Sequence, residues 1–213
     1  MRVWFQSFIT IVWSFAALTA GLLDSAQAQT VENNVLSRAS VLRDPGVPVS
    51  GNPDAEFTIV EYFDYQCPYC KQVHRVLLQV VKEDGKIRLV LKDWPIFGDV
   101  SRYAAKMALA AKFQGKYAEA HGALISAKSR LSDEAILSLL SGAGIDVAVA
   151  SADLHTHQQE IDAILERNDA QARAFDFPGT PAFIIGTFRV TSVLSAALFK
   201  QAIKDARAAA AVE

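Results

Sequence analysis

The sequence predicts an α/β domain in which a β-α-β unit and a β-β-α unit share one sheet. Runs of β-branched and aromatic residues with strand length occur within residues 57–92 and again within 182–190. The stretch between them, from 101 to about 175, has helical spacing and many alanines. The two strand-bearing segments can share one sheet only if these helices form an insertion between its halves. A composition of 51% hydrophobic and 21% charged residues is typical of a globular protein.

Residues 1–28 have the pattern of a signal peptide. Arg2 precedes an apolar run from Phe8 to Leu23, which is followed by the small-x-small cleavage site Ala26-Gln27-Ala28. The run is shorter than the ~20 residues that a spanning helix requires, although an uncleaved membrane anchor is the alternative. We expect cleavage after Ala28 and a periplasmic or secreted mature protein. Its net charge of -2 gives no electrostatic reason to expect nucleic acid as a partner.

The β-α-β unit follows an extended lead-in at residues 29–52, which is rich in turn residues and contains a short helical piece near Val35 to Leu42. Phe57 to Phe63 is predicted to be a central strand because it is almost continuously apolar. Helical spacing begins at the tetrad Cys67-Pro68-Tyr69-Cys70 and ends at Asp84-Gly85. Residues Lys86 to Lys92 are predicted to form a second strand, because apolar residues occupy every second position.

We place the folded domain at residues 53–210 and the helical insertion at about 99–175. Ser101 and Ser132 are expected to cap two of the inserted helices, because a hydroxyl group can accept from the free N–H groups of a first turn. The closing β-β-α unit comprises a strand at Ala182 to Ile185, a strand at Phe188 to Val190 and a helix from about Ser192 to Arg207.

The only two cysteines of the chain stand at the predicted start of a helix. Free N–H groups and the helix dipole stabilise a thiolate there, and Pro68 suits the first turn because it lacks an N–H group. A spacing of three places Cys70 one turn along the same face. Cys67 is therefore predicted to be an exposed nucleophile and Cys70 the resolving thiol.

Other interpretations of the tetrad are a zinc site, a structural disulfide and a pair of inert buried thiols. Zinc needs two more ligands, for which only a pair such as His155 and His157 is available. A disulfide that closes so small a loop adds little stability. We therefore favour redox chemistry, with no metal and no cofactor beyond a Cys67–Cys70 disulfide.

Two further features accompany the tetrad. Glu61 is the one carboxylate in the apolar strand that leads to Cys67, so it could relay protons to Cys70 from a buried position; the alternative is a side chain that faces water. Lys92 could balance its charge or lie solvated at a strand end. Thr180-Pro181 precedes a strand and could form a cis-proline loop against the dithiol, or a simple trans turn.

The segment from Phe63 through the tetrad to Lys71 resembles the DsbA-like family of exported thiol–disulfide oxidoreductases. Asp93-Trp94-Pro95-Ile96 and Gly179-Thr180-Pro181-Ala182-Phe183 match the same family, and the resemblance extends over roughly 53–203. It implies a thioredoxin fold, a buried acid at Glu61 and a cis-proline dipeptide at Thr180-Pro181. Two departures are the inner pair Pro68-Tyr69, in place of Pro-His, and Thr191-Ser192, where a glycine is expected. A glutaredoxin shares the tetrad but is about half as long.

These observations predict an exported thiol–disulfide oxidoreductase that forms disulfides in secreted or periplasmic proteins. Cys67, Cys70 and Glu61 are the predicted catalytic residues, and Thr180, Pro181, Pro68 and Tyr69 the predicted substrate-binding residues. The expected partners are unfolded or partly folded exported proteins with cysteines, and a recycling partner that could be a membrane protein. The alternatives are a disulfide isomerase or reductase, and a chaperone-like binding protein. The last would have a groove lined by Tyr62, Tyr65, Tyr69, Phe97 and Phe183.

Overall fold

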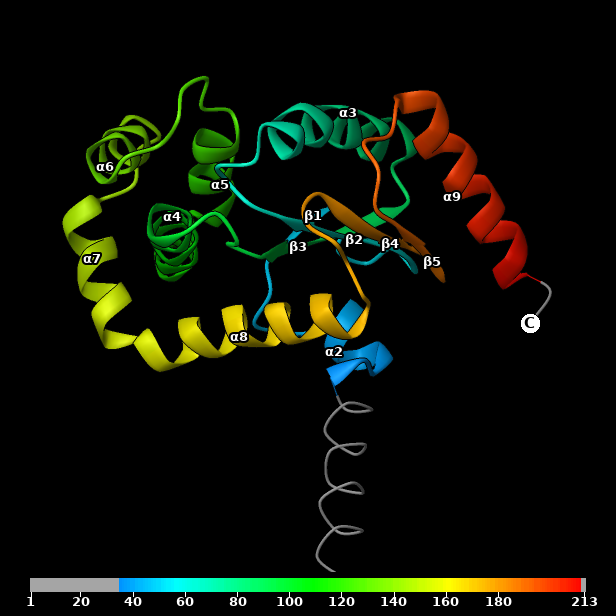
Figure 1. Ribbon diagram of the computed structural model, residues 1–213, viewed down its shortest axis with the longest axis horizontal. Coiled ribbons are helices and arrows are strands. Elements are labelled where there is room, and N and C mark those ends of the chain that lie inside the picture. Colours follow the sequence, from blue (N-terminus) through cyan, green and yellow to red (C-terminus); the bar gives the residue numbers. More distant parts are fainter. Residues whose placement is uncertain (1–34, 212–213) are drawn as a thin grey trace, which may run out of the picture.

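A computed structural model describes residues 35–211, so the predicted signal peptide lies outside the described residues. Its core is a five-stranded sheet in the order β1-β3-β2-β4-β5 (Figure 1). β2 (Phe57–Phe63) runs parallel to β3 (Ile87–Asp93) and antiparallel to β4 (Ala182–Ile185). The edges are β1 (Val49–Gly51) and β5 (Phe188–Val190). The two predicted units therefore share one sheet, and this thioredoxin-like fold confirms the predicted fold class.

Helices cover both faces of this sheet. Figure 1 shows α3 (Pro68–Asp84) and α9 (Ala196–Ala210) on one face, with α8 (Gln158–Ala174) and the short α2 (Arg38–Leu42) on the other. Side chains alternate along β2, so Glu61 faces α3 while Tyr62 faces α8. This alternation decides which groups lie behind the cysteines.

The inserted helices lie between β3 and β4, and Figure 1 shows most of them beside the sheet at the end where α3 begins. They are α4 (Asp99–Ala110), a 3-10 turn (Ala111–Gln114), α5 (Tyr117–Ile125), α6 (Asp133–Gly142), α7 (Val147–Thr156) and α8. On α4 the alanines at 104, 105, 108 and 110 are buried, which allows close packing of the helices. Within residues 35–211 no single helix has the length and hydropathy of a membrane span. α6 and α7 have that length and hydropathy only when taken together, as a pair bent by 116°.

Two predicted helix starts were wrong. Ser101 does not cap α4, which begins at Asp99, because its hydroxyl is buried and donates to Asp64 at 2.6 Å. The last helix begins at Ala196 rather than near Ser192, because the Ser195 side chain accepts the N–H of Leu198 at the helix end. Ser132 does cap α6, accepting from the N–H of Ala135. The lead-in contains the short helix α2 where a helical piece is predicted, and its last residues are extended and form the edge strand β1.

Candidate active site

The two cysteines lie at the start of α3, as predicted. Cys67 is the N-cap residue, with an extended backbone, and its Sγ accepts the N–H of Cys70 at 3.4 Å. Pro68 occupies the first turn, and Gly85 ends the helix in the left-handed conformation at φ 69°. Both cysteines are free thiols in this structure, and Cys70 is fully buried. The spacing of one helical turn thus places the two sulfurs together on the inner face of α3.

Cys67 is not exposed, contrary to the prediction. Only 1% of its surface is accessible. Its Sγ donates to the carbonyl oxygen of Thr180 at 3.3 Å, so the loop before β4 lies against the sulfur. The neighbouring Pro68 and Tyr69 are exposed, the latter by 60%. Pro68 and Tyr69 are therefore the exposed residues of the tetrad, and both sulfurs lie beneath the surface.

The two thiols differ in acidity. A hydrogen bond from the Cys70 thiol does most to lower the pKa of Cys67 to about 6, against the opposing effect of burial. The backbone N–H groups at the helix start lower this pKa further. The Thr180 side chain also lowers the pKa of Cys67. Burial, followed by the hydrogen bond to Cys67, raises the pKa of Cys70, so Cys67 carries the thiolate and Cys70 keeps its proton.

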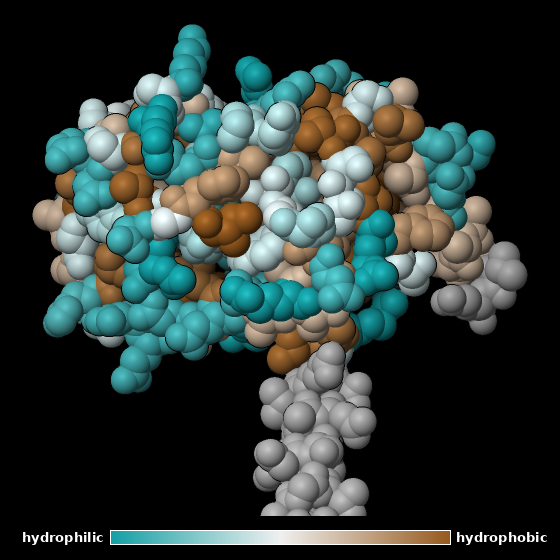
Figure 2. Space-filling model, viewed as in Figure 1, coloured by the Kyte–Doolittle hydropathy of each residue, from teal (hydrophilic) through white to brown (hydrophobic). Residues whose placement is uncertain are grey.

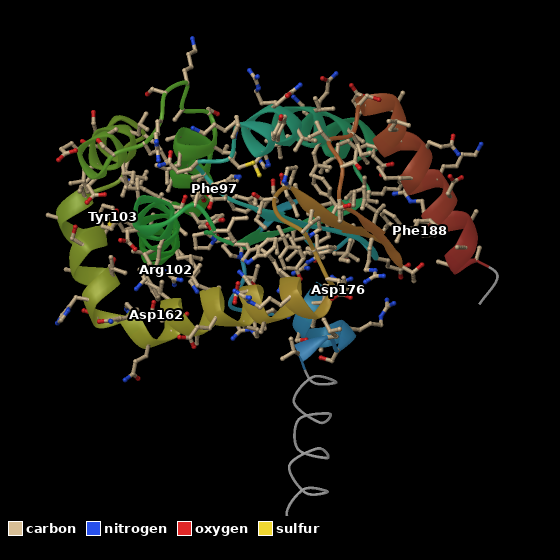
Figure 3. All side chains as sticks on the ribbon, viewed as in Figure 1. Phe97, Arg102, Tyr103, Asp162, Asp176 and Phe188 are labelled. Carbon is tan, nitrogen blue, oxygen red and sulfur yellow. The ribbon has the colours of Figure 1, made fainter. Side chains whose placement is uncertain are left out.

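The Thr180–Pro181 peptide bond is cis. Its loop places the Thr180 carbonyl on Cys67, and a Cβ atom added to Gly179 would lie 3.9 Å from the exposed side chain of Ile96. Phe97, which is 51% exposed, follows on the same loop after β3 (Figure 3). Figure 2 shows a hydrophobic patch just left of the centre of this view. The loop after β3 and the loop before β4 therefore put an apolar surface beside the dithiol.

Glu61 is fully buried on the α3 side of β2, so the water-facing alternative was wrong. Its Oε2 lies 2.7 Å from Nδ1 of His74, and the two form a buried ion pair when His74 is protonated. Lys92 neither balances Glu61 nor reaches solvent. It lies on the opposite face of the sheet, fully buried, and its Nζ donates to the carbonyl oxygen of Ser40 at 3.1 Å.

Sequence reasoning missed the two histidines behind the dithiol. His74 lies four residues after Cys70 on the buried face of α3, and this spacing was a usable signal. Its Nε2 lies 3.1 Å from Nε2 of His121, which comes from α5 of the insertion. The Nδ1 of His121 is 3.0 Å from the hydroxyl of Tyr65, just before the tetrad. A continuous buried chain of polar groups thus extends from Glu61 to Tyr65.

Asp64 was also missed, although it belongs to the segment that resembles the DsbA-like family. Its buried carboxylate accepts from the Gln66 N–H and the Ser101 hydroxyl at Oδ1, and from the N–H groups of Ile96 and Phe97 at Oδ2. The bonds from Ile96 and Phe97 fasten the turn before Cys67 to the loop after β3, and the bond from Ser101 fastens it to α4. Asp64 therefore holds in place the two surfaces that border the dithiol.

Among residues 35–211 no group of three or more histidine, cysteine or acidic side chains could hold a metal ion. His155 and His157 lie at the junction of α7 and α8, where His157 stacks on Phe113 with ring centroids 3.7 Å apart. The groove expected of a binding protein does not form as a unit. Tyr62, Tyr65 and Phe183 are core residues, and only Tyr69 and Phe97 are exposed.

Comparison with known proteins agrees with this geometry. A sequence-family model described as thioredoxin matches residues 43–205. A solved thioredoxin-like oxidoreductase from Silicibacter pomeroyi DSS-3 is 34% identical, with a TM-score of 0.77 over 80% of this chain and 98% of its own. The thiol-disulfide exchange protein alpha-DsbA2 from Wolbachia pipientis is 28% identical, with a TM-score of 0.74 over 84% and 97%. The catalytic domain of Proteus mirabilis ScsC, at 22% identity and a TM-score of 0.70 over 85% and 98%, shares the fold.

The curated relatives carry another name. The Na(+)/H(+) antiporter NhaA 1 of Mycolicibacterium gilvum is 27% identical over 162 residues, which are 75% of this chain and 26% of that protein. The chain therefore spans about a quarter of the length of the curated relatives it matches. The family match covers most of the chain and includes the Cys67–Cys70 tetrad. The chain belongs to the DsbA-like thiol–disulfide oxidoreductases of the thioredoxin superfamily.

Proposed function

We propose that the protein is an exported oxidase that forms disulfides in other exported proteins through Cys67 and Cys70. The observation that carries this proposal is the place of Cys67 at the N-cap of α3, where its Sγ accepts the N–H of Cys70 at 3.4 Å and its pKa is lowered to about 6. At pH 7 such a thiol is about tenfold more thiolate than thiol, which stabilises the reduced form. A tenfold change corresponds to about 30 mV for a two-electron couple, so the disulfide becomes more oxidising.

The reaction follows from the different acidities of the two thiols. A client thiolate attacks Sγ of Cys67 in the Cys67–Cys70 disulfide, a client–Cys67 bond forms, and Cys70 leaves as a thiolate that takes up one proton. A second client thiolate then attacks the client sulfur, and Cys67 leaves as a stable thiolate. The client has lost two electrons and the protein has gained them. A recycling partner must then accept these electrons, and we expect a membrane protein in this role.

The clients are proposed to be unfolded or partly folded exported proteins with cysteines. Tyr69, Ile96 and Phe97 are 60%, 40% and 51% exposed around the nucleophile, and an apolar stretch of an unfolded chain can cover them. Thr180, Pro181 and Pro68 border the same sulfur and complete the proposed client-binding surface. Catalysis should therefore favour cysteines with apolar neighbours over isolated small thiols.

The equilibrium reduction potential against glutathione tests the oxidase proposal. We expect a value between about -120 and about -230 mV, the range from DsbA to glutaredoxins. A value at or below about -270 mV, the thioredoxin level, would favour a reductase.

The roles of the two cysteines are tested by serine variants. Cys67→Ser should abolish oxidation of a reduced client. Cys70→Ser should still react with an oxidised client and trap it as a mixed disulfide. Oxidation by the double serine variant would instead indicate a role without the dithiol.

Export is tested separately, by N-terminal sequencing of the protein recovered outside the cytoplasm. We expect a mature chain that begins at or near Gln29. Recovery in a membrane fraction with Met1 to Ala28 intact would support the anchor alternative.

A further inference from the structure

The buried polar chain behind Cys70 joins groups from four separate segments. Glu61 lies on β2, His74 on α3, His121 on α5 and Tyr65 in the turn before the tetrad. Their successive contacts are 2.7, 3.1 and 3.0 Å, and each of the four is at most 4% exposed. Buried polar groups at such distances are hydrogen-bonded to one another, so the position of each proton constrains the next.

The contact between the two imidazoles is the decisive one, because two Nε2 atoms at 3.1 Å must share a single proton. In one state His74 is an imidazolium that donates from both nitrogens, to Glu61 and to His121. His121 then donates from Nδ1 to the Tyr65 oxygen. In the other state His74 is neutral, and His121 donates from Nε2 to it. Tyr65 then donates its O–H to Nδ1 of His121. The two states differ by one proton, and the hydrogen bonds beyond His74 reverse direction.

The groups around this chain permit both states. Burial alone would lower the pKa of His74, but the charge of Glu61 and its hydrogen bond outweigh burial and raise it. Burial and the neighbouring His74 keep the pKa of His121 well below its usual range. At the far end, Asp93 faces the hydroxyls of Tyr117 and Tyr65, and burial raises its pKa to about 7. The raised pKa of His74 favours its protonated state at one end of the chain, and Asp93 binds a proton near neutral pH at the other.

Thiol–disulfide exchange requires such a proton. When a client thiolate attacks Cys67, the S–S bond breaks and Cys70 leaves as a thiolate in a position that excludes water. Its pKa is raised by burial, so it must be protonated where it lies. His74 stands one turn further along the same helix face, at the usual i,i+4 spacing of about 6 Å between Cβ atoms. It is the nearest histidine along α3 to the leaving sulfur.

Building on the proposed exchange reaction, we propose that His121 is a positioning residue that acts through His74. By accepting the Nε2 proton of His74 or donating its own, it sets whether the Glu61–His74 pair holds the proton that Cys70 takes up. The helical insertion therefore contributes a residue to the redox step. His121 itself does not touch the reacting sulfurs in this role.

The test compares His121→Leu, which removes both ring nitrogens, with His121→Gln, which can still accept from His74 and donate to Tyr65. Two quantities are measured: the titration midpoint of His74 by NMR of the oxidised protein, and the rate of disulfide reduction by dithiothreitol per dithiothreitol thiolate. In His121→Leu the imidazolium of His74 loses a charge-assisted hydrogen bond. We expect its midpoint to fall by at least about one pH unit, and the rate at pH 7 to fall about tenfold. His121→Gln should restore most of both.

Tyr65→Phe provides a second variant that keeps the ring, should His121→Leu fail to fold. It should move the His74 midpoint in the same direction by a smaller amount. Tyr62→Phe is the matched control, because this buried hydroxyl donates to Gln171 on the other face of the sheet. It should leave both quantities unchanged.

An unchanged His74 midpoint in folded His121→Leu or Tyr65→Phe would overturn the proposal. A shifted midpoint with an unchanged rate of disulfide reduction at pH 7 would overturn it too. Absence of exchange by the wild-type protein would refute the proposed function instead. The NMR midpoint remains measurable in that case, so the two failures can be told apart.

Discussion

Replacing Cys70 with alanine removes the hydrogen bond that does most to lower the pKa of Cys67. The helix start remains in this variant, because Cys67 is still the N-cap and Pro68 still forms the first turn. A hydrogen bond to a charged group contributes about 1.5–3 kcal/mol, which corresponds to about 1–2 pKa units. From a starting value of about 6, the Cys67 midpoint should therefore rise to about 7–8.

The reaction rate should change less than this pKa. At pH 5 each unit of increase lowers the thiolate fraction about tenfold. A more basic thiolate is also a better nucleophile, with a Brønsted coefficient of about 0.4–0.5. Each unit of increase in pKa therefore raises the reactivity of the thiolate itself about threefold. Alkylation of Cys67 at pH 5 should thus be about 3- to 12-fold slower in Cys70→Ala than in the reduced wild-type protein.

The assay follows thiolate absorbance and iodoacetamide alkylation as a function of pH. Cys70→Ser is the matched control, because its hydroxyl can still donate to Cys67 and its midpoint should lie between those of the wild type and Cys70→Ala. Equal midpoints in all three proteins would refute the reasoning. They would show that the backbone N–H groups alone set the acidity of Cys67.

Two further predictions concern stability and its dependence on pH. Glu61→Gln removes the charge that raises the pKa of His74. The Glu61–His74 pair stabilises the fold below the unfolded His pKa of about 6.5, and this contribution is lost as pH rises through the higher folded pKa of His74. Denaturant melts should therefore show the largest loss of stability in this variant at acidic pH, and a loss that is constant with pH would contradict the pairing. Asp93 has a folded pKa of about 7, above its ordinary 3.8, so the wild type should lose about 3 kcal/mol relative to Asp93→Asn as pH rises from 4 to 7. Parallel stability curves would contradict the raised pKa.

The strands and the main dithiol helix were predictable because local signals determine them. The apolar run of β2 and the Asp84-Gly85 stop of α3 lie at the expected residues. The burial of Glu61 also follows from local pattern, since a strand with helices on both faces has no face left for water. His74 could have been found in the same way, from its spacing of four after Cys70.

The missed features depend on contacts between distant segments. His121 meets His74 across 47 residues, and only the docking of α5 determines that contact. The Thr180 carbonyl reaches Cys67 across 113 residues and covers a sulfur that a helix start alone would leave open. Ser101 has the sequence context of a cap, but the buried Asp64 takes its hydroxyl as a hydrogen-bond donor. Such partners cannot be deduced from periodicity, because no local pattern encodes them.

The helical insertion is part of the redox site because it completes hydrogen bonds that the sheet half leaves open. Gln66 exchanges two hydrogen bonds with the backbone of Leu131, and Lys71 donates to the carbonyl of Ala127 at 3.0 Å. Ser101 supplies one of the four donors to Asp64, and His121 covers His74. Without the insertion, the buried Asp64 would lose one of its donors and the buried His74 its partner at Nε2, each at a cost of about 1–3 kcal/mol. The geometry of the dithiol and the packing of the inserted helices are therefore coupled, and a ligand that displaces α5 must also disturb the residues that hold Cys67 and Cys70.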